Sequence, residues 1–359
     1  MPSPLRVVLV GGGQIADSTH MPAFREMSAD IEVVAVVDAT VEAARSFADR
    51  WAVPHASDDL AATLRDLRPD LVDIASPPAL HRDQVVAALR AGAWAWCEKP
   101  PCLSLAEYDE ITAAERDGGP YAAVIYQQRF GSAAQHARAL ISAGALGRPY
   151  VAHCQTTWFR DPGYYAVPWR GRWETEGGGP AMGLGIHQID LMLELLGDWS
   201  EVRGMAARLA RDVRTDDVTT ALVRFDSGAL ATLVSTSLAP RQVSHLRVDL
   251  AAATLELTHL YGYANENWTI TPAPGVTGLD WPPPDDVPSS HLAQLRGLVS
   301  DLRAGRRPRG SGQDGRRALE LITAMYKAAL TGQPVRSGEI GPGDPFHRNL
   351  HGDNPEVFQ

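Results

Sequence analysis

A glycine-rich turn near the start of the chain constrains the fold more than any other feature of the sequence. The apolar, β-branched run at residues 5–10 leads directly into GGGQIA at residues 11–16, and a helical pattern follows. In the motif G-x-G-x-x-A, the first glycine permits a tight turn, the second lets a pyrophosphate approach the main chain, and the small last residue lets the helix lie close to the sheet. The motif predicts a strand, a phosphate-binding turn and a helix. The residues expected to contact a dinucleotide here are Gly11, Gly13, Gln14 and Ile15.

An acidic residue after the second apolar run supports this prediction. The run at residues 31–37 is followed by Asp38, 22 residues after Ala16, close to the spacing of about 20 at which a carboxylate binds a ribose 2′-hydroxyl. Ala39 and Thr40 come next, with no basic residue. Because a carboxylate would repel the 2′-phosphate of NADP, we predict that the cofactor is NAD and that NADP is disfavoured.

The remainder of the first half alternates short apolar runs with helical patterns, which predicts a doubly wound parallel sheet. Two of the expected strands, at residues 71–75 and 93–97, are followed by SPP and EKP. Ligands of such sheets bind at the carboxyl ends of the strands, so we expect these segments, and the residue after the strand at 121–126, to face the cofactor. The residues concerned are Ser76, Pro77, His81, Glu98, Lys99 and Gln127. For His81, an exposed position at a helix start is an equally favoured interpretation.

Lys99 stands out because lysine is rare in this chain. It and Lys327 are the two lysines among 33 basic residues. A lysine kept in a chain that otherwise uses arginine indicates a position where a compact, titratable ammonium cannot be replaced by a guanidinium. We therefore favour a functional role for Lys99 over a solvated strand end.

A second glycine-rich segment, GGGPAMGLGIHQID at residues 177–190, leads into an amphipathic helix. Apolar residues recur there at steps of three and four and predict a buried stripe. By the same spacing, Gly183, His187, Asp190 and Glu194 share the adjacent stripe. Taken alone, a histidine on a helix is a packed or capping residue more often than a catalyst.

The second half of the chain changes to period-two patterns, which are typical of half-buried antiparallel strands. Strands are expected at residues 148–158, 219–225, 229–235, 246–250 and 254–260, and helices at 289–302 and 315–330. We therefore predict an NAD(P)-binding Rossmann domain over residues 1–130 and an α/β domain, built on an antiparallel sheet with one apolar face, over residues 131–359.

Composition disfavours several classes of partner and site. A net charge of −10 and an isoelectric point near 5.5 provide no basic surface for nucleic acid, and no apolar run approaches the roughly 18 residues of a membrane span. The three cysteines are too few for a disulfide framework and lack metal-ligand spacing. We therefore expect a cytoplasmic protein with no metal, no nucleic-acid partner and no membrane partner.

The order of these motifs resembles the family of glucose-fructose oxidoreductase and inositol dehydrogenase (Gfo/Idh/MocA). The motifs are the glycine turn, Asp38, Ser76-Pro77 with His81, Glu98-Lys99-Pro100, and much later G-x-H-x-x-D at residues 185–190. The resemblance covers most of the chain. It implies that the second domain carries an open, largely antiparallel sheet that often mediates oligomerisation, which would make a homodimer or homotetramer. It also implies hydride transfer at a carbinol carbon of a sugar, cyclitol or related polyol.

An aromatic segment is a candidate for substrate contact. Residues 158–173 hold six aromatic side chains interleaved with arginines. Rings stack on the apolar faces of sugars and arginines donate to hydroxyl or carboxylate groups, while packing at an interface or in the core is an equally favoured interpretation. With the second glycine-rich segment, the candidate substrate residues are Arg160, Tyr165, Trp169, Arg170, Gly183 and Asp190.

The resemblance also suggests which residues are catalytic. Hydride transfer to nicotinamide needs a proton acceptor for the hydroxyl group and a nearby donor or cation, and we assign these roles to His187 and Lys99. In the family an aspartate typically precedes the histidine by four residues, whereas this chain has Gly183. Two alternatives stay open: an NAD-binding accessory or regulatory protein without turnover, and an enzyme that retains NAD during epimerisation or glycoside cleavage.

Overall fold

The computed structural model describes residues 3–358, which form two compact units. The first unit comprises the chain up to residue 102, residues 106–125 and residues 294–316. The second comprises residues 103–105, 126–293 and the chain from residue 317. The expected single boundary after residue 130 differs from this division, because a late segment returns to the first unit.

The first unit is built on a six-stranded parallel sheet in the order β3-β2-β1-β4-β5-β6. The strands are β1 (Leu5–Val10), β2 (Ile31–Val37), β3 (His55–Ser57), β4 (Leu71–Ile74), β5 (Trp94–Cys97) and β6 (Ala122–Val124). All four residues of β4 and of β5 are buried, as expected where helices cover both faces of a parallel sheet. The strand order reverses between β1 and β4, and at such a switch point a ligand crevice opens at the carboxyl ends.

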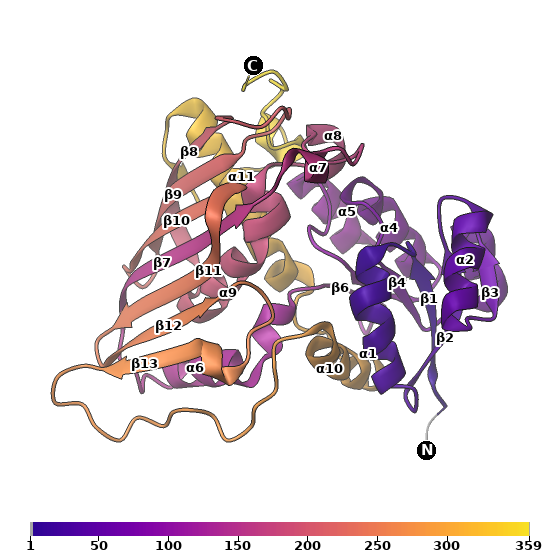
Figure 1. The fold of residues 1–359 in the computed structure, drawn as a ribbon, viewed down its shortest axis with the longest axis horizontal. Coiled ribbons are helices and arrows are strands. Elements are labelled where there is room, and N and C mark those ends of the chain that lie inside the picture. The colour runs from indigo at the N-terminus through magenta and orange to yellow at the C-terminus, as the bar shows by residue number, and fades with distance from the viewer. Residues whose placement is uncertain (1–2, 359) are drawn as a thin grey trace. The chain divides into compact units, whose positions relative to one another are not determined.

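Helices connect these strands as the alternation predicts (Figure 1). They are α1 (Met21–Glu26), α2 (Val41–Trp51), α3 (Leu60–Leu67), α4 (His81–Arg90) and α5 (Leu105–Ala114), while most of α10 (His291–Ala304), which connects no strands of this sheet, also belongs to the unit. Thr40 and Asp59 cap α2 and α3 by accepting main-chain hydrogen bonds. One difference is that a π-helical turn, Ala16–His20, precedes α1. A second is that the segment at 305–312, for which no element was predicted, adds to the sheet edge, since the Val124 N–H donates to the Gly310 carbonyl at 2.9 Å.

The second unit contains an eight-stranded sheet in the order β13-β12-β11-β7-β10-β9-β8-β14. Neighbouring strands are antiparallel except for the parallel pair β7 and β10. The strands are β7 (Pro149–Phe159), β8 (Trp199–Ala207), β9 (Val218–Phe225), β10 (Leu230–Thr236), β11 (Leu238–Leu250), β12 (Ala253–His259), β13 (Trp268–Pro272) and β14 (Val335–Arg336). The five expected strands are confirmed, whereas β8, β13 and β14 were not predicted.

Helices cover one face of this sheet (Figure 1). These helices are α6 (Ser132–Ser142), α9 (Ile186–Leu196) and α11 (Gly312–Thr331), and the unit also contains three short helices, α7 (Pro162–Tyr165), α8 (Trp173–Glu176) and α12 (Pro345–Arg348). Helix α9 packs on β7 and β11 and is buried along almost its whole length. Within residues 3–358, no helix combines the length and apolar character needed to cross a membrane.

Candidate active site

The glycine turn after β1 has the geometry of a phosphate-binding loop. Gly11 has φ +94°, and a Cβ there would lie 2.8 Å from the main chain of Ala75 and Ser76, so only glycine fits. At Gly13, by contrast, a Cβ would meet nothing within 4 Å. Packing within the protein therefore does not require glycine at position 13. The space beside this residue is open, as the approach of a pyrophosphate to the main chain requires.

Gly12 was not among the predicted cofactor contacts, because the motif accepts any residue at its second position. A Cβ there would lie 2.9 Å from the Phe47 ring of α2. Its N–H donates to Asp38 Oδ2 at 2.8 Å, and the Ala39 N–H donates to Asp38 Oδ1 at 2.7 Å. The half-buried Asp38 carboxylate therefore joins the glycine turn to the end of β2. Gln14 and Ile15 begin the helical segment, exposed and half-buried respectively.

His81, predicted at the cofactor, is fully buried, and its ring nitrogens lie 2.7 Å from the carbonyl oxygens of Ser76 and Pro100. Burial lowers the pKa of His81. Its ring joins the half-buried Ser76-Pro77 loop to the segment that follows Lys99. In that loop the Ser76 hydroxyl donates to Gln84 at 2.6 Å. The cofactor contact of His81 stays a prediction.

A buried ionic cluster includes Glu98, the residue that precedes Lys99, and no sequence motif predicted this cluster. His20 Nδ1 lies 2.8 Å from Asp73 Oδ2 of β4, and His20 Nε2 lies 3.2 Å from Glu98 Oε1. Burial alone would lower the pKa of His20, but the charges and hydrogen bonds of Asp73 and Glu98 raise it to about 10. The Lys99 N–H donates to Glu98 Oε2 at 3.1 Å. Glu98, expected at the cofactor, thus anchors the main chain of Lys99.

In the second unit, His187 lies in the first turn of α9, directly after a π-helical turn at Ala181–Gly185. Its side chain is buried, and its ring packs edge-on against Tyr261, with centroids 5.8 Å apart. Gln127, expected at the cofactor, is buried and donates its amide hydrogen bond to the Tyr261 hydroxyl. Trp158 packs on the other side of Tyr261, with centroids 6.1 Å apart. Tyr261 escaped prediction because it follows β12 in a loop without a motif.

The aromatic segment folds into one cluster of rings and guanidinium groups. Arg160 lies over Trp158, 4.8 Å from the ring centroid. Arg170 lies over Tyr164 and Trp169, at 3.9 and 4.2 Å. Burial raises the pKa of Tyr165 to about 12, so this neighbour stays a neutral hydroxyl at physiological pH. The structure therefore brings Arg160, Tyr165, Trp169 and Arg170 together, as the sequence suggested.

Asp190, a candidate substrate contact, is fully buried, and the equally buried Arg129 donates from Nε to Asp190 Oδ2 at 2.6 Å. Glu194 lies 3.3 Å from another nitrogen of the same guanidinium. A buried carboxylate needs such a partner, so Asp190 has a structural contact, and its contact with substrate stays a prediction. At Gly183, a Cβ would lie 3.2 Å from Glu176 Oε1.

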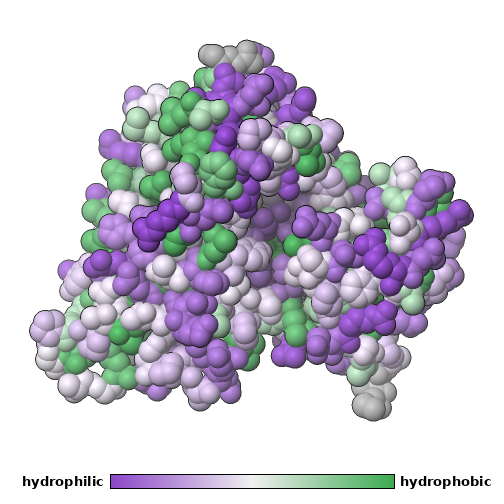
Figure 2. Space-filling model, viewed as in Figure 1, coloured by the Kyte–Doolittle hydropathy of each residue, from purple (hydrophilic) through white to green (hydrophobic). Residues whose placement is uncertain are grey.

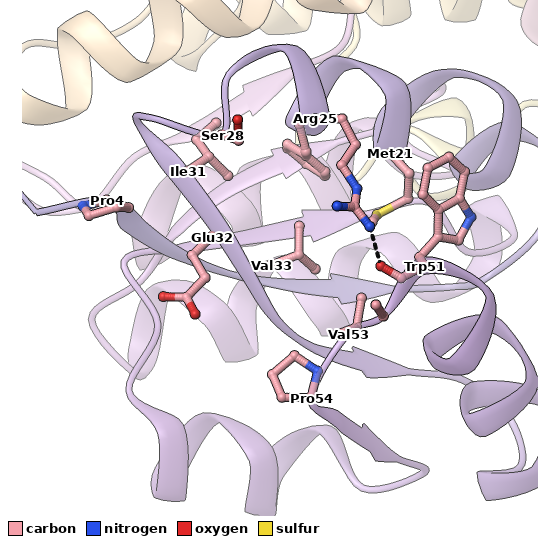
Figure 3. A pocket seen from close by; sticks show the side chains of 12 residues that line it. Pro4, Met21, Arg25, Ser28, Ile31, Glu32, Val33, Trp51, Val53 and Pro54 are labelled. Atoms are coloured by element: carbon pink, nitrogen blue, oxygen red, sulfur yellow. Dashed lines mark hydrogen bonds between the residues drawn. The ribbon is translucent and has the colours of Figure 1, made fainter.

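A surface cavity of about 320 Å³ in the first unit is separate from these residues (Figure 3). Its lining includes Pro4 before β1, Ile31 at the start of β2 and Pro54 before β3. These are the amino ends of the strands, whereas Gly11 and Asp38 follow the carboxyl ends. Because cofactors of doubly wound sheets bind at the carboxyl ends, this cavity is not the dinucleotide site.

Comparison with known families agrees with this geometry. Residues 5–126 match the family described as an oxidoreductase family with an NAD-binding Rossmann fold, and residues 134–256 match the GFO/IDH/MocA C-terminal domain. The chain belongs to the Gfo/Idh/MocA oxidoreductases. It is therefore an oxidoreductase with NAD as its cofactor, and nothing in the comparisons supports the accessory or NAD-retaining alternatives.

Named relatives match nearly the whole chain. It is 28% identical to D-glucoside 3-dehydrogenase of Escherichia coli, over 93% of this chain and 97% of the relative. It is 30% identical to D-apiose dehydrogenase of Paraburkholderia graminis, over 91% and 88%. Among solved structures, the WlbA dehydrogenase from Bordetella pertussis, in complex with NADH and UDP-GlcNAcA, is 26% identical with a TM-score of 0.83 and covers 93% of this chain and 98% of its own.

Proposed function

We propose that this protein transfers a hydride between NAD and a carbinol carbon of a sugar, cyclitol or related polyol. The observation that carries the proposal is the carboxyl edge of the parallel sheet, where the glycine turn with open space at Gly13, the Asp38 carboxylate and the Glu98-Lys99 segment all follow strand ends. The names of the relatives, D-glucoside 3-dehydrogenase and D-apiose dehydrogenase, support a sugar substrate.

A small set of residues performs the proposed reaction. NAD, held by the glycine turn and Asp38, supplies the hydride acceptor when bound. Lys99 donates a hydrogen bond to the reacting hydroxyl group and stabilises negative charge on its oxygen. His187 accepts the hydroxyl proton. Arg160, Tyr165, Trp169 and Arg170 offer ring faces and donors to the rest of the substrate.

A turnover assay tests the proposal. The purified protein is incubated with NAD and a panel of aldoses, glycosides and cyclitols, and NADH is followed by its absorbance. We expect NADH formation with at least one member of the panel and none after Lys99→Ala. NAD binding without turnover across the panel would favour the accessory protein, and product without net NADH would favour the NAD-retaining enzyme.

Cofactor preference provides a second test. Asp38→Asn removes the negative charge that faces the ribose, while its amide oxygen still accepts one of the two N–H groups that Asp38 binds. We expect the preference for NAD over NADP, measured as the ratio of kcat/KM values, to fall about tenfold or more, because like charges facing each other cost several kcal/mol. Asp66→Asn, an exposed acid of the same unit, is the control and should leave the ratio unchanged. An unaltered ratio in Asp38→Asn would contradict the assignment.

We further propose that the protein forms a homodimer or homotetramer through the face of the eight-stranded sheet opposite its helices. Met205, Leu222 and Leu230 lie on adjacent strands and are 75%, 60% and 48% exposed. The strand register and the alternation of side chains place them on one face. Figure 2 shows hydrophobic surface among polar residues in this part of the second unit. Monomers rarely expose large apolar patches.

The assembly is tested with Leu222→Asp. We expect this change to produce monomers, measured as molar mass by light scattering after size-exclusion chromatography, because it places a charge in the apolar patch. Leu80→Asp, at a similarly exposed leucine of the first unit, should retain the wild-type mass. A wild-type protein that is monomeric at micromolar concentration would refute the proposal.

The three cysteines are free and buried, which fits a reducing compartment. We therefore propose a cytoplasmic location.

A further inference from the structure

Glu176 is a buried carboxylate that the proposed mechanism does not use. It ends the short helix α8, and its side chain is 8% exposed. Burial of a carboxylate is costly, so such a group usually serves a nearby cation, donor or catalytic residue. Its Oε2 accepts the Gly171 N–H at 2.6 Å, and its Oε1 lies 3.4 Å from Arg170. The short contact fixes Oε2, whereas the contact between Arg170 and Oε1 is long, so the surroundings of Oε1 are the informative feature.

That second oxygen points at the bare side of Gly183. A Cβ on Gly183 would lie 3.2 Å from Glu176 Oε1, closer than almost any real Cβ contact. The carboxylate thus occupies space into which a side chain at position 183 would extend. Gly183 precedes His187 by four residues on one continuous helical segment, and residues at this spacing project from about the same face of a helix.

We propose that Glu176 is the positioning residue of His187: its carboxylate, supplied from α8 across Gly183, orients the imidazole and stabilises its protonated form. A carboxylate beside a histidine base does both in many proton-transfer sites. The absence of a side chain at Gly183 then serves the site, because even a Cβ there would press on the Glu176 carboxylate and move it by a few tenths of an ångström. The inference rests on the proposed role of His187 as proton acceptor.

Other charged and titratable groups around Glu176 determine the pH range in which its effect on His187 can be measured. Arg170, Tyr164 and Tyr165 are charged or titratable neighbours that interact with its carboxylate. Burial raises the pKa of both tyrosines, so they remain neutral between pH 5 and 9. Changes in this pH range that depend on Glu176 therefore do not arise from these phenols.

The first experiment measures the state of the imidazole without turnover. The ring signal of His187 is identified in NMR spectra of the full chain by its loss in His187→Gln, and is titrated in the wild type and in Glu176→Gln. We expect the midpoint to fall by about one pH unit in Glu176→Gln, because an opposite charge favours the protonated ring. Glu174→Gln, in the same helix but 55% exposed, should leave the midpoint unchanged. An unchanged midpoint in Glu176→Gln would overturn the proposal.

The second experiment moves the carboxylate to position 183. We expect Glu176→Ala to lower kcat about tenfold to hundredfold, with a smaller change in the KM for NAD. Adding Gly183→Asp to Glu176→Ala should restore at least tenfold, because the new carboxylate extends into the space that the old one left. A double variant that binds NAD but is no faster than Glu176→Ala would overturn the proposal. Full activity of His187→Ala would instead refute the proposed proton acceptor, and thus separates the two failures.

Discussion

Lys99→Met is expected to lower kcat about a thousandfold, the middle of the range for loss of a proton-transfer or charge-stabilising group. Methionine keeps most of the length and apolar contacts of the side chain but removes the ammonium, so the negative charge that develops on the hydroxyl oxygen loses its stabilising donor. The Lys99 main chain should stay in place, since its N–H bonds to Glu98. NAD affinity, followed by fluorescence titration, is expected to change little.

The other lysine of the chain provides the matched control. Lys327 lies in α11 and binds Glu339 and Asp344 at 2.8 and 2.7 Å, so Lys327→Met removes these two partly buried ion pairs, which are not part of the proposed mechanism, and should leave kcat unchanged. Lys99→Arg should remain strongly impaired, because a planar guanidinium cannot take the place of a compact ammonium. Wild-type turnover in Lys99→Met would show that the lysine belongs to the fold and not to the reaction.

His20→Ala is expected to lower the free energy of unfolding of the first unit by about 3–5 kcal/mol, the usual cost of removing one partner of a buried ion pair. The variant would leave Asp73 and Glu98 buried without the imidazolium that now lies between them. Urea unfolding at pH 7, followed by the fluorescence of Trp96, which packs on His20, measures the loss. His55→Ala, an exposed histidine of the same unit, should be nearly neutral.

The same cluster predicts a dependence of stability on pH. The pKa of His20 is 6.5 in an unfolded chain and about 10 in the folded protein. A raised folded-state pKa contributes stability that is fully present below the unfolded value and is lost as pH rises through the folded value. The difference in unfolding free energy between wild type and His20→Ala should therefore be largest near pH 6 and shrink progressively between pH 6.5 and 10. A difference independent of pH would contradict a charged His20.

The parts of the site that follow from short stretches of sequence were predictable. The glycine turn and Asp38 lie at the ends of neighbouring strands, and the rules of parallel sheets bring them together without detailed packing. The aromatic segment was predictable in composition but not in arrangement. Its stacking of Arg170 between Tyr164 and Trp169 depends on a short helix, α7, that carries no strong periodic signal.

Other features depend on contacts between residues distant in sequence. His20 and Glu98 are separated by 78 residues and Gln127 and Tyr261 by 134, and no local pattern marks either pair. The hydrogen-bond partners of His81 and Asp190 were not predictable for the same reason. These partners, the Pro100 carbonyl and Arg129, come from other elements, so only the structure shows that both side chains are buried and bonded within the protein.

The sequence alone determined the Rossmann unit, the preference for NAD and the candidate Lys99, because strand-end motifs encode these locally, and the order of its motifs along the chain added His187 as a candidate. Only the tertiary structure decided how each candidate is supported. The main chain of Lys99 is bonded to Glu98, which in turn contacts His20. The Glu176 carboxylate lies at the position toward which a side chain of residue 183 would point. The physical reason is that a buried charged group needs an interaction partner, and packing can bring that partner from any part of the chain. The spacing of residues in the sequence therefore does not predict which residue the partner is.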